Sequence, residues 1–413
     1  MTPRRATVWH GQTPVGVLSG ALRFTYDADW LSSGFAISLS LPLSEGEMDG
    51  EAFFSGLLPE GLARQRICRQ YGLPESDDAA LLLAIGRDCA GALAVLPEGE
   101  GHDETAAPVT MTEEDLARLV ATRGQALPTS SERIRFSLAG AQDKVAVILD
   151  ADGMRLPTAQ HPSSHILKFE SMRWVCFAEH AANELARELG LNVPRVRYRA
   201  HPEGPYLEIE RYDRGRDGHG TLFRLHQEDM MQALGLSATL KYQEHGGPDL
   251  GLVSERIRRH SSDPVRDVAA LRDWQIFNYL AGNSDGHAKN LALLYHPETR
   301  APRLSPLYDL ACIEHLNRLG LHFDRKLAFY VGGNNLPEQI TKHDWNTFAK
   351  ALGVPPKSML SRLQALAERL PQLARNVRQR FADEFGDNQA LGRFEESIAD
   401  RCAWTLRSVF GRG

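Results

Sequence analysis

The segment "NSDGHAKN", residues 283–290, lies between two apolar runs, "IFNYLAG" and "LALLY". The spacing of apolar residues in the first run predicts a helix that is buried on one face, and the second run predicts a short strand. The polar segment is then the loop between them. Reactive side chains often lie on loops that a rigid scaffold fixes, so these eight residues are the first candidate for chemistry.

Two acidic motifs suggest which chemistry this is. Asp285 and Asn290 have the spacing D-x-x-x-x-N, in which the Asp can accept the proton of an attacking hydroxyl and the Asn can bind Mg²⁺ during phosphoryl transfer. Asp309 follows in "LSPLYDLA", where a carboxylate could chelate the metal that bridges two phosphates. Each motif also has a plainer interpretation. Residues 283–290 are typical of a solvated Asx-rich turn, and Asp309 of a helix N-cap.

A lysine upstream could bind the phosphates of a nucleotide. In "HILKFE", Lys168 lies on a predicted strand among apolar neighbours, where its ammonium group needs an anion. Glu179, on the helix that follows, is the favoured residue to orient this lysine, and Glu184 is the alternative. Lys168 could instead belong to an edge strand, with its charged end in water.

Two further segments could complete a nucleotide site. In "RFSLAGAQDK" the small residues Ala139, Gly140 and Ala141 let backbone amides approach a phosphate, although a plain turn fits this segment equally well. In "LEIERYDR" the backbone from Glu210 to Tyr212 could pair with the edge of an adenine, as could that of any edge strand. The order of all these parts along the chain is the order found in protein kinases.

Composition limits the classes of protein. Of the 413 residues, 42% are hydrophobic and 24% are charged, which predicts a globular protein of two or three lobes. The net charge of -6 offers no general basic surface for nucleic acid. Five scattered cysteines without a CxxC pair fit a reducing cytoplasm, and no apolar stretch is long enough to cross a membrane. We therefore expect a cytoplasmic protein.

The pattern along the chain predicts an α+β, bilobal, protein-kinase-like fold. We expect an N-terminal α+β module in residues 1–98, a linker in 99–125, a kinase N-lobe in 126–214 and a helical C-lobe in 215–413. In the first module, "FAISLSLPL" alternates like a strand, and "DDAALLLAIGRDCAGALAVL" has helical spacing with Asp77 or Asp78 as its N-cap.

The motifs "SLAGAQDK", "HILKFE", "ERYDR", "KYQEHGGPDL", "FNYLAGNSDGHAKNLALLY" and "LSPLYDLAC" resemble the HipA family of bacterial toxin-antitoxin serine/threonine kinases. The segments "FFSGLLPEG" and "IGRDCAGAL" are similar to the N-terminal domain of that family. The resemblance implies that Asp285 is the catalytic base and that Asn290 and Asp309 bind Mg²⁺. It also implies a set of ATP contacts: Ala139, Gly140, Ala141, Gln142, Lys144, Lys168, Glu210, Tyr212, His287 and Lys289.

The resemblance also implies regulation and partners. Ser137 matches the serine that the family autophosphorylates, and a phosphate there would inactivate the kinase by repelling the γ-phosphate. Members pair with a helix-turn-helix antitoxin of the HipB type, which makes most of the contact with operator DNA. The best-known target is an aminoacyl-tRNA synthetase, that for glutamate. The alternatives are a catalytically weak corepressor that docks the antitoxin, and a small-molecule kinase.

Overall fold

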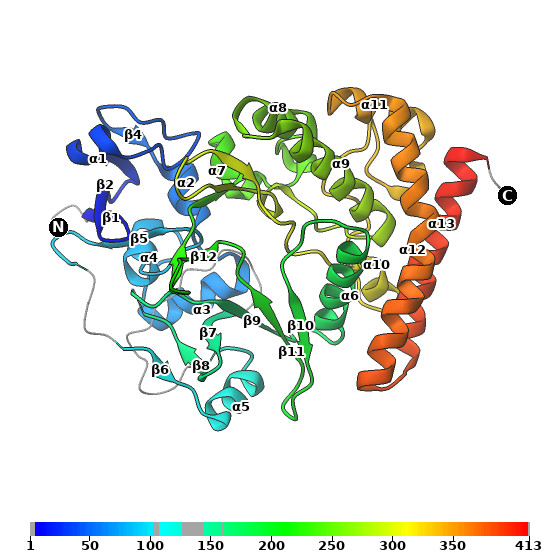
Figure 1. Cartoon of the computed structure of the whole chain (residues 1–413), viewed down its shortest axis with the longest axis horizontal. Helices are drawn as coiled ribbons and strands as arrows, with labels where there is room; N and C mark the ends of the chain where they lie inside the picture. The colour runs from blue at the N-terminus through cyan, green and yellow to red at the C-terminus, as the bar shows by residue number, and fades with distance from the viewer. Residues whose placement is uncertain (1–4, 102–106, 126–143, 159, 412–413) are drawn as a thin grey trace. The chain divides into compact units, whose positions relative to one another are not determined.

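The computed structural model describes residues 5–101, 107–125, 144–158 and 160–411, which form two compact units (Figure 1). Each unit takes three segments of the chain. Unit 1 comprises Met1–Ser171, His201–Thr239 and Ala292–Pro302, and unit 2 comprises Met172–Ala200, Leu240–Leu291 and Arg303–Gly413. The boundaries at residues 98, 125 and 214 stay predictions.

The first sheet of unit 1 has the strand order β4-β3-β2-β1-β5, with all neighbours antiparallel. Its strands are β1 (Arg5–His10), β2 (Thr13–Ser19), β3 (Arg23–Tyr26), β4 (Met48–Asp49) and β5 (Leu93–Pro97). The helices that accompany it are α1 (Ala28–Ser33), α2 (Glu51–Gly56), α3 (Gly61–Tyr71) and α4 (Asp78–Ile85). Alternate strand residues such as Val8 and Val15 pack with Phe53 and Leu81 in one core.

The structure confirms one local prediction in this module and corrects two. Asp77 is the N-cap of α4, because its side chain accepts a hydrogen bond from the backbone N–H of Ala80 at 2.9 Å. The end of the same run, "LAVLP", is strand β5 rather than helix, since it pairs with β1. The run "FAISLSLPL", residues 35–43, forms an isolated bridge between Ser38 and Leu41 instead of a strand.

A second sheet contributes five strands to unit 1, in the order β11-β9-β7-β8-β6. They are β6 (Val109–Thr110), β7 (Lys144–Asp150), β8 (Gly153–Leu156), β9 (His165–Phe169) and β11 (Tyr206–Glu210). Val145, Leu167 and Tyr206 lie on one face of the sheet and form a core with Leu119 of α5 (Glu113–Ala121). By alternation the other face carries Lys168.

A buried carboxylate joins distant segments of unit 1. Glu228 lies on β14 (Gln227–Asp229), which pairs with β15 (Ala292–Tyr295) and precedes α7 (Met230–Leu234). Its side chain accepts hydrogen bonds from the Ser38 hydroxyl at 2.5 Å, from the Leu39 backbone N–H at 3.1 Å and from the Tyr295 hydroxyl. Burial raises the pKa of Glu228 to about 7, although these hydrogen bonds oppose the shift. These bonds explain why residues 35–43 form a turn.

A hairpin in unit 1 begins at Arg214, the last residue of the motif "ERYDR". It consists of β12 (Arg214–Arg216) and β13 (Leu222–Arg224). We name the following residues the arginine–aspartate cluster: Asp88, Arg211, Asp213, Arg214 and Arg224. Arg211 binds Asp213 through two hydrogen bonds of 2.9 and 2.6 Å, and the Gly91 backbone N–H donates to Asp213 at 2.9 Å.

Unit 2 is mainly helical. Its helices are α6 (Val175–Glu188), α8 (Leu250–His260), α9 (Pro264–Ala281), α10 (Ile313–Arg318), α11 (Lys342–Ala351), α12 (Pro356–Phe385) and α13 (Gln389–Phe410). Shorter elements are β10 (Val196–Arg199), the 3₁₀ turns Gln243–His245, Ala288–Asn290 and Pro337–Gln339, and β16 (Pro302–Leu304), which lies at the segment boundary. Two long helices, α12 and α13, run side by side at the C-terminal end (Figure 1). Apolar residues at helical spacing, Met359, Leu363, Leu366 and Leu370, form the buried side of α12.

The five cysteines of the chain are all described, and each is a buried thiol outside any disulfide. Among the helices of the described residues, none combines the length and the apolar character that crossing a membrane requires.

Candidate functional site

The polar segment 283–290 is a loop between helix α9 and strand β15, as the sequence predicts. We name it the Asp285 loop. Helix α9 begins at the N-cap Asp263 and ends at Gly282, whose left-handed backbone has φ 69°. The helix is buried on more than one face, because every residue from Asp273 to Ala281 is buried. The loop therefore starts from a helix that is anchored on several faces. The sequence predicts burial of only one face, so it underestimates how firmly the helix is held.

Buried asparagines and a glycine fix the start of the loop. The Asn283 side chain donates to Asn278 Oδ1 at 3.0 Å and accepts a hydrogen bond from the Asp285 backbone N–H at 3.2 Å. A Cβ atom at position 286 would lie 2.5 Å from Asn278 Nδ2, so a larger residue there would displace the Asn278 side chain. The interpretation as a solvated turn is therefore wrong for most of the loop, since Asn283 and residues 286–290 are buried.

Asp285 is the exposed exception. Its side chain is 56% exposed, whereas that of His287 is 8% exposed. Oδ1 of Asp285 accepts a hydrogen bond from the Tyr242 hydroxyl and lies 4.0 Å from Nε2 of His287. Its second oxygen, Oδ2, accepts no hydrogen bond from the residues that the structure describes. A carboxylate held through one oxygen can accept a proton from a hydroxyl on the other.

Asn290 has the opposite character, because it is only 3% exposed. Its Nδ2 donates to the Asp285 carbonyl at 2.9 Å, and its backbone N–H donates to the His287 carbonyl at 2.9 Å. Since a carbonyl can only accept, this bond fixes the orientation of the Asn290 amide. The Oδ1 atom then accepts nothing from the described part of the chain. An amide oxygen in this state is a suitable ligand for a hard cation.

A tyrosine links the segment that contains Asp309 to the Asp285 loop. The Tyr308 hydroxyl donates to the Lys289 carbonyl at 2.5 Å, so the neighbours of Asn290 and Asp309 are bonded to each other. Asp309 is exposed and has a left-handed backbone with φ 59°. Its interpretation as a helix N-cap is wrong, since α10 begins after Cys312 and no side chain caps it. A strained exposed carboxylate is typical of functional sites.

Unit 1 holds two of the three predicted lysines, Lys144 and Lys168. Lys144 on β7 lies directly opposite Lys168 on β9, and Lys168 is 6% exposed. Strand β9 lies between β7 and β11, which excludes the interpretation of Lys168 as an edge-strand residue. Directly opposed side chains of an antiparallel pair lie on the same face of the sheet, so a phosphate on that face would meet two cationic groups.

The other predicted residues are placed with less detail. Glu210 is the exposed last residue of β11, and Tyr212 is half-buried. On α6, Glu179 is buried, whereas Glu184 forms ion pairs with Arg187 and with Arg380. The pairing of Glu179 with Lys168 stays a prediction. The predictions for Ser137, Ala139, Gly140, Ala141 and Gln142 lie outside the described residues.

Two groups of residues escaped the sequence interpretation. Tyr242 and Tyr308 contact the Asp285 loop, but no pattern within "KYQEHGGPDL" or "LSPLYDLA" singles out either residue. Three residues of the arginine–aspartate cluster belong to the motif "ERYDR", for which the sequence predicts only a possible contact with adenine. Burial alone would raise the pKa of Asp213, but Arg211 and Arg214 outweigh it and lower the pKa. The possible backbone contact of Glu210 and Tyr212 with adenine stays a prediction.

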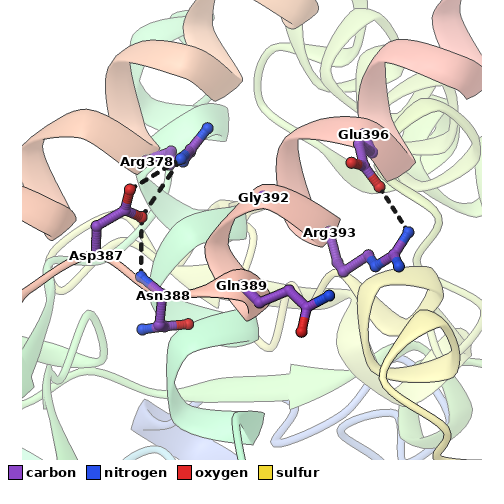
Figure 2. Close-up of a pocket in the computed structure, with 7 residues that line it drawn as sticks. All are labelled: Arg378, Asp387, Asn388, Gln389, Gly392, Arg393 and Glu396. Carbon is purple, nitrogen blue, oxygen red and sulfur yellow. Dashed lines mark hydrogen bonds and ion pairs between the residues drawn. The ribbon is translucent and has the colours of Figure 1, made fainter.

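An open surface hollow of about 450 Å³ lies where α12 turns into α13 (Figure 2). Its charged side chains pair with one another, as in Arg378 with Asp387 and Arg393 with Glu396, both at 3.0 Å. No predicted site residue lines it. Among the described residues, no group of three or more His, Cys, Asp or Glu side chains is placed to hold a metal ion.

Two family models match the chain. The model of the HipA-like C-terminal domain matches residues 136–374, and that of the HipA N-terminal domain matches residues 6–96. The "Putative kinase Y4mE" of Sinorhizobium fredii is 34% identical over 99% of this chain and 100% of its own length. The "Serine/threonine-protein kinase toxin HipA" of Shewanella oneidensis is 30% identical over 85% of this chain and 83% of its own length.

A solved structure agrees with these matches. The HipA chain in a complex of Shewanella oneidensis HipA, HipB and operator DNA superposes with a TM-score of 0.83 at 25% identity, covering 98% of this chain and 97% of that chain. The match confirms the predicted α+β, HipA-like fold. Together with the two family models, it shows that this chain belongs to the HipA family.

Proposed function

We propose that this chain is a protein serine/threonine kinase that uses ATP and Mg²⁺ and acts as the toxin of a toxin-antitoxin pair. One observation carries the proposal. The exposed Asp285 carboxylate, the Asn290 amide oxygen and the segment of Asp309 belong to one bonded arrangement, closed by the Tyr308–Lys289 hydrogen bond. This arrangement supplies a base and two oxygen ligands, which are the groups that phosphoryl transfer needs.

Each residue has a defined task in the proposed reaction. Oδ2 of Asp285 accepts the proton of the attacking serine or threonine hydroxyl. Asn290 Oδ1 and the Asp309 carboxylate would hold Mg²⁺, which commonly takes only one or two protein ligands beside phosphate and water. When bound, ATP supplies the phosphoryl group, and the cation neutralises the charge that develops on it. The buried Asn290 amide fits this role because its nitrogen is already committed to the Asp285 carbonyl.

The lysine pair supports a phosphate site in unit 1. Lys144 and Lys168 lie directly opposite each other, so both would attract the negative charge of a nucleotide phosphate. Glu179 is the residue we propose to orient Lys168. The amides of Ala139, Gly140 and Ala141, the side chain of Gln142, and Glu210, Tyr212, His287 and Lys289 complete the proposed nucleotide contacts. Their support is the family resemblance.

Ser137 is the proposed site of self-inactivation. A phosphate adds about -1.5 to -2 charges at neutral pH, which would repel the γ-phosphate of a bound nucleotide. The position of Ser137 at the head of the segment "SLAGAQDK" supports this assignment.

The proposed partners follow the structural relative. Shewanella oneidensis HipA occurs in a complex with HipB and operator DNA, which supports a HipB-type antitoxin as the partner of this chain. The net charge of -6 fits an antitoxin that makes most of the DNA contact. The proposed target is an aminoacyl-tRNA synthetase, that for glutamate, and this rests on the family alone. The same complex also favours the second candidate function, a catalytically weak corepressor.

The test is intact mass measurement and peptide mapping of the purified chain after incubation with Mg²⁺ and ATP. We expect one added phosphoryl group on Ser137 in the wild type and none in Asp285→Ala. Starting material should first be treated with a phosphatase, which is then removed. A wild type that binds ATP but gains no phosphate, and that phosphorylates no synthetase, would favour the corepressor.

A further inference from the structure

We propose that Tyr242 is a positioning residue for the Asp285 carboxylate. It would hold Oδ1 by a hydrogen bond, so that Oδ2 remains available for the hydroxyl of the protein substrate. The inference rests on the proposed kinase function and deepens it. It assigns a task to a residue of the motif "KYQEHGGPDL" that the chemistry described above does not use.

The hydrogen bond from Tyr242 restricts the rotation of the exposed Asp285 side chain. A side chain that is 56% exposed would sample several rotamers and lose the alignment that proton transfer needs. The Tyr242 hydroxyl donates to Oδ1, and the His287 ring, at 4.0 Å from the same oxygen, is beyond hydrogen-bonding distance. Tyr242 is thus the one described residue that donates a hydrogen bond to this carboxylate. Its removal should free the rotation of the Asp285 side chain.

The tyrosine is itself held against the Asp285 loop. Its ring meets the His287 ring edge-on, with centroids 5.2 Å apart and an interplanar angle of 89°. The Lys241 ammonium lies 5.7 Å from the centroid of the same ring. The Lys241 carbonyl accepts a hydrogen bond from the Ala288 backbone N–H at 3.3 Å. Residues 241 and 242 therefore contact both the backbone and a side chain of the loop.

The segment behind Tyr242, residues 241–247, is a constrained turn, which we name the tyrosine turn. A Cβ atom at Gly247 would lie 1.9 Å from the Leu240 carbonyl oxygen, so no other residue fits. The Gln243 backbone N–H donates to the Ala328 carbonyl at 3.1 Å, and its side-chain oxygen accepts from the Tyr330 N–H at 2.9 Å. The turn is thus anchored on the side away from the loop as well.

The phenol could have a different effect at the same place. If its hydroxyl occupied the position of the substrate hydroxyl, Tyr242 would block the base and removing the hydroxyl would raise the rate. If it positions the base, removing the hydroxyl would lower the rate. The unengaged Oδ2 atom favours positioning, because a second site for a hydroxyl is present on the same carboxylate.

The experiment compares Tyr242→Phe with the wild type, with Asp285→Ala and with Tyr330→Phe. Tyr330→Phe is the matched control, because its residue contacts the tyrosine turn through the backbone and its hydroxyl makes no hydrogen bond with the described residues. The measurement is the kcat and the KM for ATP in the autophosphorylation-deficient Ser137→Ala background, with the protein substrate that the wild type phosphorylates. Thermal melting checks that each variant folds.

We expect kcat of Tyr242→Phe to fall about tenfold to a hundredfold, as for loss of a hydrogen bond to a charged group. The KM for ATP should stay within about twofold, because the ring packing remains and only the alignment of the base is lost. Tyr330→Phe should match the wild type. A smaller folded fraction would also lower the apparent kcat and leave KM unchanged, so the thermal melting of each variant is needed to separate lost alignment from lost folding.

The results that would contradict the role of Tyr242 can be distinguished from those that would contradict the kinase function. An active wild type with an unchanged rate in Tyr242→Phe overturns the inference and leaves the kinase function intact. A faster Tyr242→Phe also overturns it, and identifies the tyrosine as a block on the base. A wild type that transfers no phosphate to any substrate overturns the kinase function together with this inference.

Discussion

The arginine–aspartate cluster and the Asp285 loop are both dense in polar residues, yet they differ in how those residues are satisfied. In the cluster, Asp213 accepts from Arg211, Arg214 and a backbone amide, and all these side chains are almost fully buried. In the loop, the supporting asparagines are buried while the Asp285 carboxylate is exposed and bonded through one oxygen. A polar motif whose charges are buried and paired with opposite charges serves the architecture, whereas an exposed carboxylate held through one oxygen can do chemistry.

The largest expected effect is on phosphoryl transfer at the Asp285 loop and the nearby Asp309. Asp309→Asn removes a charge while keeping a residue that tolerates the left-handed backbone, and Asp309→Gly removes the side chain at the same φ. Both variants should lower phosphoryl transfer by about 10³-fold or more, roughly 4 kcal/mol of transition-state stabilisation. Kinase assays and thermal melting provide the two measurements. Wild-type activity in either folded variant would exclude Asp309 as a metal ligand.

The next largest effect is on the stability that the arginine–aspartate cluster provides. Asp213→Ala leaves Arg211 and Arg214 buried without their main counter-charge, so the free energy of unfolding should fall by about 3–5 kcal/mol. Asp400→Ala is the control, because it removes a 68% exposed carboxylate from an ion pair with Arg318 and should cost at most about 1 kcal/mol. Chemical denaturation measures both. Equal losses in the two variants would show that burial does not distinguish them.

The smallest effect is on the pH dependence of stability and comes from Glu228, a buried carboxylate whose hydrogen-bond donors are neutral. The folded-state pKa of Glu228, about 7, lies above its usual value, so the folded protein holds this proton more tightly than the unfolded chain. Its contribution to stability is complete below about pH 4.5 and is lost as the pH rises through about 7. Glu228→Gln cannot ionise. Relative to the wild type, it should gain roughly 1–3 kcal/mol between pH 5.5 and pH 8.

Denaturation curves at these two pH values test this prediction. His226, whose burial lowers its pKa to about 3, and His10, lowered to about 4, are present in both proteins and act on the acid side. The difference between variant and wild type therefore isolates Glu228. A constant difference at both pH values would contradict the raised pKa.

The local sequence pattern was sufficient to predict those elements whose structure depends on residues close together in the sequence. The helix before residue 283 and the strand after residue 290 could be predicted because their apolar residues follow a regular period. The Asp77 cap is similarly local. The residues of the D-x-x-x-x-N motif could be singled out because phosphoryl transfer needs a base and a metal ligand in a short loop.

Distant partners decided the features that local pattern missed. Ser38 pairs with Glu228, 190 residues away, which turns an alternating run into a bend. Arg214 and Arg224 form ion pairs with Asp88, which lies more than 120 residues earlier in the chain. The structural role of "ERYDR" therefore could not be predicted from the motif alone. The left-handed backbone of Asp309 has no sequence signal, because aspartate adopts many backbone conformations.

The three-segment construction of unit 1 has a consequence for synthesis on the ribosome. The turn at Ser38 cannot complete its hydrogen bonds until Glu228 and then Tyr295 have emerged. At about 5–20 residues per second, the nascent chain waits on the order of ten seconds to a minute between the first of these residues and the last. During this time the unfinished core exposes apolar surface, so nascent chains arrested before residue 295 should be more sensitive to protease than those arrested after residue 302 is exposed.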